Sequence, residues 1–333
     1  MFRHINYEKI ISIDNLLDSW REFLRGKKKL KDVIEFSLHL TDHILQLHQD
    51  LKDKTYRHGK YHAFKINDPK PRDIHKASVR DRLVHHSIYK ILYPYFDNKF
   101  IFDSYSCRLD KGTHKAIARF KNFSQKVSVN NTRTVWILKG DIKKFFASID
   151  HIILQGILKR YIVDQDILWL LNQLISSFNT EDKTNVGLPL GNLTSQLFVN
   201  IYMNEFDQFI KHKLKVKYYI RYADDFVVFS KNKIYLEQLI PQLGKFLGNN
   251  LRLTLHPQKL FIRTLASGVD FLGWVIFPHH LVPRTSTKKR MFKRLQQHCS
   301  KKSLTSYTGI LGHGNTYKIV REIKTNYPDF LFD

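Results

Sequence analysis

The amino-acid sequence predicts an α+β fold, and the order of its apolar patterns leads to that class. Short apolar runs at 135–138 and 218–220, the latter resumed at 226–229, are rich in β-branched and aromatic residues, as buried strands are. Between these runs, segments 151–178 and 196–212 carry apolar residues at helical spacing. A strand, then helices, then a hairpin is typical of α+β domains.

The segments on either side of this core have simpler patterns. Residues 1–60 are polar and predicted to be helical, with a turn at Gly59. The prolines of segment 67–72 predict extended chain or a turn. Residues 80–95 carry an apolar stripe at helical spacing, which predicts a core helix without a chemical role. The spacing within 288–298 is also helical.

Charge is the most informative property of the composition. The 333 residues include 55 Lys and Arg against 30 Asp and Glu, a formal net charge of +25, and 43% of them are hydrophobic. A folded chain with this excess of cations is expected to bind a partner rich in phosphate, which makes nucleic acid the leading candidate. For the basic segment after residue 280, a solvated helix face is the alternative to a duplex-binding one.

Several other protein classes are disfavoured. Neither Cys107 nor Cys299 has a second cysteine at metal-ligand spacing, so no zinc motif is visible. The first residues lack the apolar core of a signal peptide. The longest uncharged stretch, 184–204, is too polar to span a membrane. These features predict a soluble, cytoplasmic protein.

Aspartates that end or interrupt apolar runs are the candidate chemical site. Asp224 and Asp225 stand between two apolar runs, and Asp141 follows another. Asp is a poor strand former and adjacent like charges repel, although a hairpin turn is the simpler explanation. If the strands are neighbours, the three carboxylates converge on a site that suits Mg²⁺, with Mn²⁺ as a substitute. Two such ions catalyse phosphoryl transfer, which leaves polymerases, other nucleotidyltransferases and nucleases open.

The motifs around these aspartates identify a family. Tyr222-Ala-Asp-Asp225 resembles the YxDD hairpin of reverse transcriptases, and the segment 138–146 resembles the palm strand that precedes it in that family. Further segments that resemble the family follow in order: KPRDI at 70–74, VRDRLVHHSI at 79–88, SYSCRLDKGTHKA at 104–116, GLPLGNLTSQ at 187–196, HPQKLFI at 256–262 and FLGW at 271–274. The resemblance covers nearly the whole chain after its N-terminal segment.

This resemblance implies a right-hand polymerase that acts as an RNA-directed DNA polymerase. Its parts would be an N-terminal helical extension at 1–60, fingers and palm at 61–280 and a basic helical thumb at 281–333. Asp141 and Asp224 would ligate two metal ions together with the backbone carbonyl of Ile142. Asp225 would support the same site electrostatically.

The resemblance also implies residues that bind the dNTP, the primer and the duplex. Phe146 would lie beneath the sugar and exclude a ribose 2′-hydroxyl, although an ordinary core aromatic is the alternative. Arg72 would meet the triphosphate, and Lys259 would help pyrophosphate to leave. Leu190 and Gly191 would complete the dNTP site. The primer grip would be Phe271, Leu272 and Gly273, and the duplex backbone would be bound by Lys288, Lys289, Arg290, Lys293 and Arg294.

One segment points to a subtype. Most reverse transcriptases carry Gln and Pro where this chain has Leu190 and Gln196, and the form found here resembles the enzymes of diversity-generating retroelements. Those bacterial and phage systems copy a template RNA with frequent errors at adenines. Because Leu offers only apolar contact where Gln can hydrogen-bond, discrimination near the nascent base pair should weaken. The alternative is that Leu190 merely packs.

The expected partners are template RNA, the RNA/DNA hybrid, dNTPs and a small basic accessory protein that binds the RNA and the polymerase; no membrane is expected. A retron-like or phage-defence reverse transcriptase is the nearest alternative. An RNA-binding protein of the maturase kind, with a vestigial polymerase site, is an alternative from another class, and the full set of Asp141, Asp224 and Asp225 argues against it.

Overall fold

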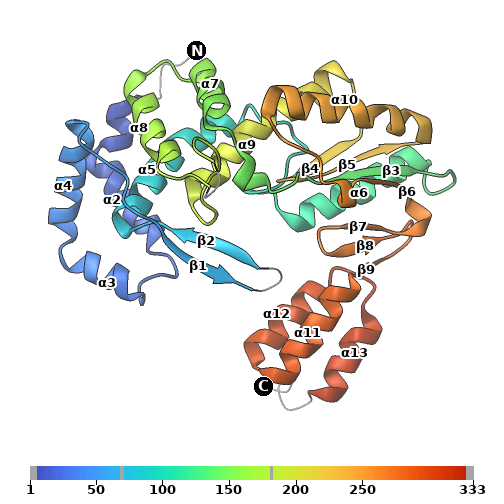
Figure 1. Cartoon of the computed structure of the whole chain (residues 1–333). Helices are drawn as coiled ribbons and strands as arrows, with labels where there is room; N and C mark the ends of the chain where they lie inside the picture. The colour runs from blue at the N-terminus through green and yellow to red at the C-terminus, as the bar shows by residue number, and fades with distance from the viewer. Residues whose placement is uncertain (1–5, 68–70, 181–182, 328–333) are drawn as a thin grey trace. The chain divides into compact units, whose positions relative to one another are not determined.

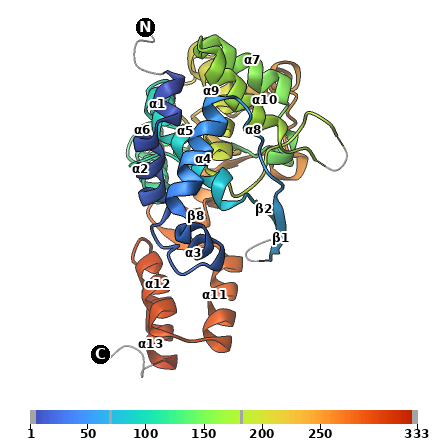
Figure 2. The same ribbon diagram turned by 90° about the vertical axis from the view of Figure 1, so that its left-hand side faces the viewer.

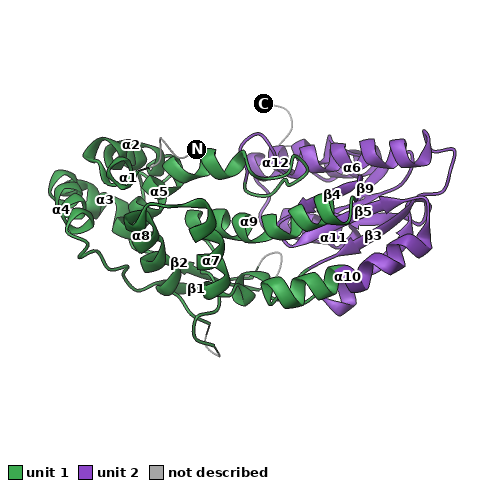
Figure 3. Cartoon of the chain, turned by 90° about the horizontal axis from the view of Figure 1, so that it is seen from above, with its two compact units in different colours: residues 1–107, 142–215, 243–255 green, residues 108–141, 216–242, 256–333 purple. Residues whose placement is uncertain are grey.

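The computed structural model describes residues 6–67, 71–180 and 183–327 of the chain (Figure 1). Residues 68–70, within the extended segment or turn predicted at 67–72, therefore lie outside the described residues. The chain folds into two compact units, each formed by segments that are far apart in sequence (Figure 3). Unit 1 comprises residues 1–107, 142–215 and 243–255, and unit 2 comprises residues 108–141, 216–242 and 256–333. The division into domains at residues 60 and 280 stays a prediction.

Unit 1 begins with helices, as the polar pattern of residues 1–60 predicted. These are α1 (Tyr7–Ile11), α2 (Ile13–Phe23), α3 (Lys31–Leu38) and α4 (Leu40–Lys52). The helix predicted at 80–95 is α5 (Val79–Asp97), which buries its apolar stripe against α1, α2 and α9 (Leu193–Gln208). Helix α2 packs on α5, and α4 packs on α2 (Figure 2).

The rest of unit 1 contains a hairpin and further helices. The antiparallel strands β1 (His62–Ile66) and β2 (Arg72–Lys76) pair from His62 with Lys76 to Ile66 with Arg72. The helical pattern of 151–178 is confirmed as α7 (His151–Tyr161) and α8 (Gln165–Ser176). The pattern of 196–212 corresponds to α9 and a π-helical turn at Phe209–Lys213.

Unit 2 is built on an antiparallel sheet with the strand order β4-β5-β3-β6. Its strands are β3 (Trp136–Gly140), β4 (Tyr219–Tyr222), β5 (Asp225–Ser230) and β6 (Phe261–Thr264). The helix α6 (Thr113–Ser128) packs on β4 and β5. Because β3 pairs directly with β5, the condition for the convergence of the aspartates is met. The helix α10 (Lys233–Leu251) has its first part in unit 2 and its end in unit 1.

One cross-strand contact fixes the register of this sheet. Gly140 pairs with Phe226, and a Cβ atom on Gly140 would lie 2.3 Å from the Phe226 ring. Since real atoms do not approach so closely, a glycine is required where the Phe226 ring crosses β3.

The C-terminal part of unit 2 contains a small sheet and a helical cluster. The sheet has the order β7 (Val269–Phe271), β8 (Trp274–Ile276) and β9 (Leu281–Pro283). The helices α11 (Thr285–Gln297), α12 (Lys301–Leu311) and α13 (Tyr317–Asn326) follow, which confirms the helix expected at 288–298. Their shared core consists of Met291, Leu295, Leu304, Leu311 and Ile323. No helix in the part of the chain that the structure describes is long and apolar enough to cross a membrane.

Candidate active site

A two-residue turn between β4 and β5 carries Asp224. Tyr222 pairs with Asp225 across the turn, and Ala223 has a left-handed backbone with φ of 54°. This conformation is uncommon for a residue other than glycine. The side chain of Arg221 is fully buried and donates a hydrogen bond from Nη1 to the carbonyl of Ala223 at 3.1 Å. The protein therefore braces a strained turn at the position of the aspartates.

Asp141 directly follows β3, the strand beside β5. The residue is 6% exposed, and its Oδ1 accepts a hydrogen bond from Lys259 Nζ at 2.7 Å. Its backbone carbonyl accepts from the amide of His256 at 2.7 Å. The chain continues into Ile142, which forms an antiparallel bridge with Leu255. Asp141 is thus held through both its backbone and its carboxylate.

Lys139, which the sequence reasoning missed, is the second cation of the site. Its side chain is 10% exposed, donates to the carbonyl of Asp270 at 3.0 Å and forms an ion pair with Asp225 Oδ1 at 3.5 Å. A buried ammonium group needs such partners, because desolvation without them is expensive. The signal in the sequence was a lysine within an apolar strand, two residues before Asp141.

The carboxylates lie within one another's electric field. Burial raises the pKa of Asp224 to about 6, and the negative charges of Asp141 and then Asp225 contribute to the rise. Burial also raises the pKa of Asp225, although Lys139 acts in the opposite direction. The site is therefore short of positive charge even with both lysines in place.

A divalent cation would supply the missing positive charge. Some side chains of the site would have to change their partners to bind it. Among the described residues, no group of three His, Cys, Asp or Glu side chains is gathered closely enough to hold a metal ion. Asp141 and Asp225 are instead paired with Lys259 and Lys139. The donors are all carboxylate oxygens, which hard divalent ions prefer. Because the Lys259 side chain is 42% exposed, it can swing away from Asp141 into solvent.

Four of the predicted dNTP-binding residues, Arg72, Phe146, Leu190 and Gly191, lie in unit 1, where backbone hydrogen bonds connect their segments, whereas Lys259 lies in unit 2. The carbonyl of Phe146, a half-buried residue, accepts from the amide of Leu188 at 2.8 Å. The carbonyl of Leu190 accepts from the amide of His75 in β2 at 3.0 Å, and β2 begins at the exposed Arg72. The structure therefore joins the segments of Phe146, Leu190 and Arg72.

Gly191 has a structural reason to be glycine. Its φ is 109°, and a Cβ atom would lie 3.0 Å from Ile74 in β2. Any side chain would therefore be strained and would crowd that strand. The close approach keeps the exposed Gly191 against β2.

The predicted primer grip forms the turn between β7 and β8. Phe271 is fully buried and stacks on Phe120 with 5.4 Å between the ring centroids, so its ring is part of the core. Leu272 and Gly273 make the turn with φ of 51° and 89°, and both are half-buried. Any contact with a primer would thus use the turn and not the Phe271 ring.

The predicted duplex-binding cations lie on α11. Lys289, Lys293 and Arg294 are exposed, whereas Lys288 and Arg290 are half-buried. Lys288 also forms an ion pair with Glu322 of α13 at 3.3 Å. The exposed cations are therefore the better placed for phosphate.

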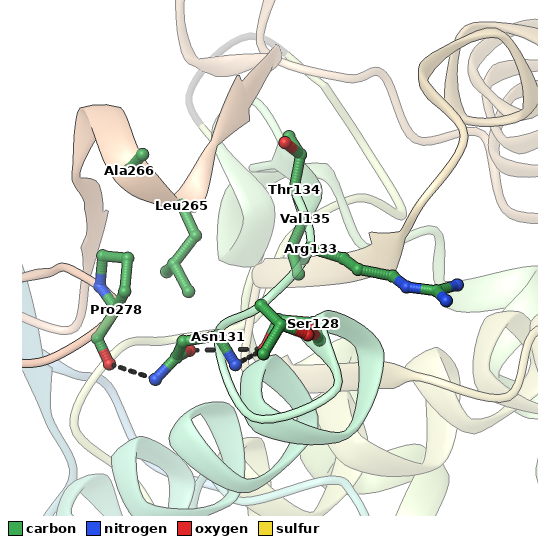
Figure 4. A pocket seen from close by; sticks show the side chains of 9 residues that line it. Ser128, Asn131, Arg133, Thr134, Val135, Leu265, Ala266 and Pro278 are labelled. Atoms are coloured by element: carbon green, nitrogen blue, oxygen red, sulfur yellow. Dashed lines mark hydrogen bonds between the residues drawn. The ribbon is translucent and has the colours of Figure 1, made fainter.

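A pocket of about 220 Å³ lies elsewhere in unit 2 (Figure 4). Asn131 donates across it to the carbonyl of Pro278 at 3.2 Å, and Arg133 is the charged residue of its lining. Its lining contains none of the predicted site residues. The pocket therefore gives no support to the predicted site.

An antiparallel sheet whose adjacent strands present Asp141 and the Asp224–Asp225 turn has the layout of the palm of a template-directed polymerase. Residues 60–276 match the family model described as reverse transcriptase (RNA-dependent DNA polymerase). The chain belongs to this family, and it is an enzyme of the RNA-directed DNA polymerase class.

Relatives are similar to the chain in sequence, and a solved structure is similar to it in fold. The chain is 26% identical to protein YkfC of Escherichia coli, over 70% of each chain. It is also 26% identical to the group II intron-encoded protein LtrA of Lactococcus lactis, over 75% of this chain and 51% of LtrA. The fold resembles apo telomerase of Candida tropicalis truncated from its C-terminal domain, with a TM-score of 0.51, 13% identity, and coverage of 74% of this chain and 60% of that one. The chain thus spans about half of LtrA and somewhat more of that telomerase.

Replacing Asp224 with Asn should stabilise the metal-free protein at neutral pH. The pKa of Asp224 in the folded state, about 6, lies above its ordinary value of 3.8, so the ionised carboxylate destabilises the fold above pH 6. Asp224→Asn should raise the free energy of unfolding by about 1–3 kcal/mol at pH 8. Between pH 6 and pH 4 the wild-type carboxyl takes up its proton, and the gain should shrink to about a third at pH 4.5.

Urea unfolding in the presence of a chelator measures this effect. Asp42→Asn is the control, because Asp42 is exposed in the first turn of α4 and its replacement should give no gain. Equal stabilities of wild type and Asp224→Asn at pH 8 would contradict the crowding of the carboxylates.

Replacing Lys139 with Met should destabilise the protein and impair the site. The change leaves Asp225 and the Asp270 carbonyl without their buried cation, at a cost of about 1–3 kcal/mol. The double variant Lys139→Met/Asp225→Asn should recover part of that stability but no polymerase activity. Lys259→Met should cost less than about 1 kcal/mol, since Lys259 is half-exposed. Chemical unfolding of the four proteins tests this order, and equal losses for Lys139→Met and Lys259→Met would refute it.

Proposed function

We propose that this chain copies a template RNA into cDNA by two-metal nucleotidyl transfer, as the mutagenic reverse transcriptase of a diversity-generating retroelement. The observation that carries the polymerase chemistry is the arrangement of Asp141, Asp224 and Asp225 on adjacent strands, close enough to raise the pKa of Asp224. The subtype rests on the residues of segment 187–196.

Asp141 and Asp224 would hold two Mg²⁺ ions with the carbonyl of Ile142, and Mn²⁺ could replace them. Such ions activate the attacking 3′-oxygen and stabilise the leaving pyrophosphate. Asp225, paired with Lys139, supplies negative charge beside the ligands. Lys259 pairs with Asp141, and its ammonium would supply a proton to the leaving pyrophosphate.

The other assigned residues select and position the substrates. Arg72 offers a planar guanidinium to the triphosphate, and Phe146 closes the space that a ribose 2′-hydroxyl would need. Leu190 gives the dNTP an apolar contact without a hydrogen bond. The exposed cations Lys289, Lys293 and Arg294 bind the phosphates of the hybrid, because an A-form duplex offers side chains little sequence information.

The selection of one template would come from folded RNA and a partner. Backbone contacts do not distinguish sequences. We therefore include in the proposal a small basic accessory protein that binds both the RNA and the polymerase.

Primer extension on a defined RNA template tests the proposal, with wild type beside Asp224→Ala/Asp225→Ala. We expect cDNA from wild type with Mg²⁺, with errors concentrated opposite template adenines. The double variant should make no detectable cDNA, because the site loses its metal ligands, and it should bind the RNA with unchanged affinity.

The outcomes separate the candidate functions. Faithful cDNA would retain the polymerase and favour a retron-like or phage-defence enzyme. An absence of cDNA even with native RNA and the partner would favour an RNA-binding protein of the maturase kind.

Replacing Leu190 with Gln should reduce the misincorporation opposite adenines. A hydrogen bond contributes about 1 kcal/mol, so the error frequency should fall by roughly fivefold. Leu188→Met is the matched control, because Leu188 is buried in the same loop and should not affect fidelity. Sequencing of the cDNA measures both variants, and an unchanged error spectrum in Leu190→Gln would refute the role of Leu190.

A further inference from the structure

A buried chain of polar side chains lies beneath the Leu190–Gly191 loop in unit 1. It runs between helices α9 and α5 to the segment that precedes β1. Thr194 Oγ1 is 2.5 Å from His85 Nδ1, and His85 Nε2 is 3.2 Å from His58 Nε2. Thr194 and His85 are 1% and 2% exposed. None of the residues assigned above to metal, primer or dNTP binding is Thr194, His85 or His58.

When the His58 ring is neutral, its partners set the direction of each hydrogen bond in the chain. His58 Nδ1 lies 2.7 Å from the carbonyl of Gly59, which can only accept, so this nitrogen donates. In a neutral ring, His58 Nε2 then accepts, and His85 Nε2 must donate to it. His85 Nδ1 is left as an acceptor for the Thr194 hydroxyl. Burial and the neighbouring His58 hold the pKa of His85 well below its usual range, in agreement with a neutral ring.

The chain ends on a buried carboxylate. Asp81, 1% exposed, accepts from the amide of Gly59 at 3.1 Å, from the Tyr56 hydroxyl at 2.7 Å and from Ser78 Oγ at 2.6 Å. Arg80 lies 3.6 Å away and supplies the opposite charge. Because its oxygens are satisfied, Asp81 anchors the network in place.

At its near end the network reaches the loop. Thr194 lies in the first turn of α9, and the helix begins directly after Asn192. Asn192 Nδ2 donates to the carbonyl of His75 at 2.9 Å, and the amide of His75 donates to the carbonyl of Leu190 at 3.0 Å. The segment 190–194 is thus tied to β2 on one side and to His85 on the other.

We propose that His85 and Thr194 are positioning residues that hold segment 190–194 in the conformation that receives the incoming dNTP. This inference rests on the proposed role of Leu190 and Gly191 in dNTP binding. A pair of apolar side chains would pack α5 against α9 without a buried polar cost. A directional hydrogen bond, in contrast, also fixes the rotation of the first turn of α9, and with it the backbone that leads to Gly191.

This role predicts that loss of the Thr194 hydroxyl changes KM for dNTP but not kcat. Loss of the Thr194 hydroxyl should weaken the binding of dNTP and leave the chemical step intact, because the aspartates are untouched. A lost neutral hydrogen bond corresponds to an increase of about fivefold in KM.

The experiment measures single-nucleotide incorporation of dTTP opposite a template adenine, with the full chain on a primed RNA. Thr194→Val should raise the KM for dTTP about fivefold with kcat within about twofold, and Thr194→Ser should restore both values. Ser87→Ala is the matched control. It removes a buried hydroxyl from α5 whose only partner among the described residues is the carbonyl of Val84, and it should change neither constant. Thr194→Ala replaces Thr194→Val if valine prevents folding.

Leu190→Ala, measured beside these variants, separates the inference from the proposed function. An unchanged KM in a folded Thr194→Val or Thr194→Ala overturns the inference, whatever Leu190→Ala does. An unchanged KM in Leu190→Ala instead overturns the dNTP-binding role of the loop, and with it the route by which Thr194 would act. A fall in kcat at constant KM, or the same change in Ser87→Ala, would show a general structural role and overturn the inference as well.

Discussion

Repulsion between the carboxylates of Asp141, Asp224 and Asp225 is the interaction on which the organisation of unit 2 depends. Burial strengthens this repulsion, because water no longer screens the charges. Burial itself raises the pKa of Asp224, and the repulsion from Asp141 and Asp225 adds to the rise. Two lysines compensate the negative charge of the carboxylates in different ways. Lys139 is buried and tied to Asp225 and to the Asp270 carbonyl, so it is part of the framework. Lys259 is half-exposed and can leave Asp141, so it acts as a replaceable counter-ion.

The sheet keeps these charges together against their repulsion. Pairing of β3 with β5 sets the positions of Asp141 and the hairpin, and the Phe226 ring over Gly140 prevents a shift of register. The left-handed Ala223 and the buried Arg221 brace the turn itself. Strain and buried charge are therefore concentrated in one short hairpin, which is typical of a functional site whose cost is met by the packing around it.

Local sequence patterns predicted the helices and strands whose apolar residues recur at a regular spacing. The apolar stripe of α5 and the strands around Asp141 and Asp224 were visible because their periodicity is strong. Strands β7, β8 and β9 span only a few residues each, which is too short for a period, so their sheet was not predicted. The burial of Phe271 and Lys139 could not be predicted either, because it depends on Phe120 and Asp270, which are distant in sequence. The assignment of separate chain segments to each of the two units could not be predicted either, because it also depends on contacts between residues that are distant in sequence.

Under the proposed function, the loop that carries Leu190 would let low fidelity coexist with activity. A polymerase whose nucleotide site was loose throughout would lose dNTP affinity along with accuracy. Here the backbone of segment 190–194 is tied to β2 and to the buried His85, whereas the Leu190 side chain is apolar. If Leu190 contacts the nascent base pair, the loss of accuracy comes from this one side chain, while the backbone that carries it is held in place. Errors would then depend on which template base most needs the missing hydrogen bond, and not on a general loss of substrate binding.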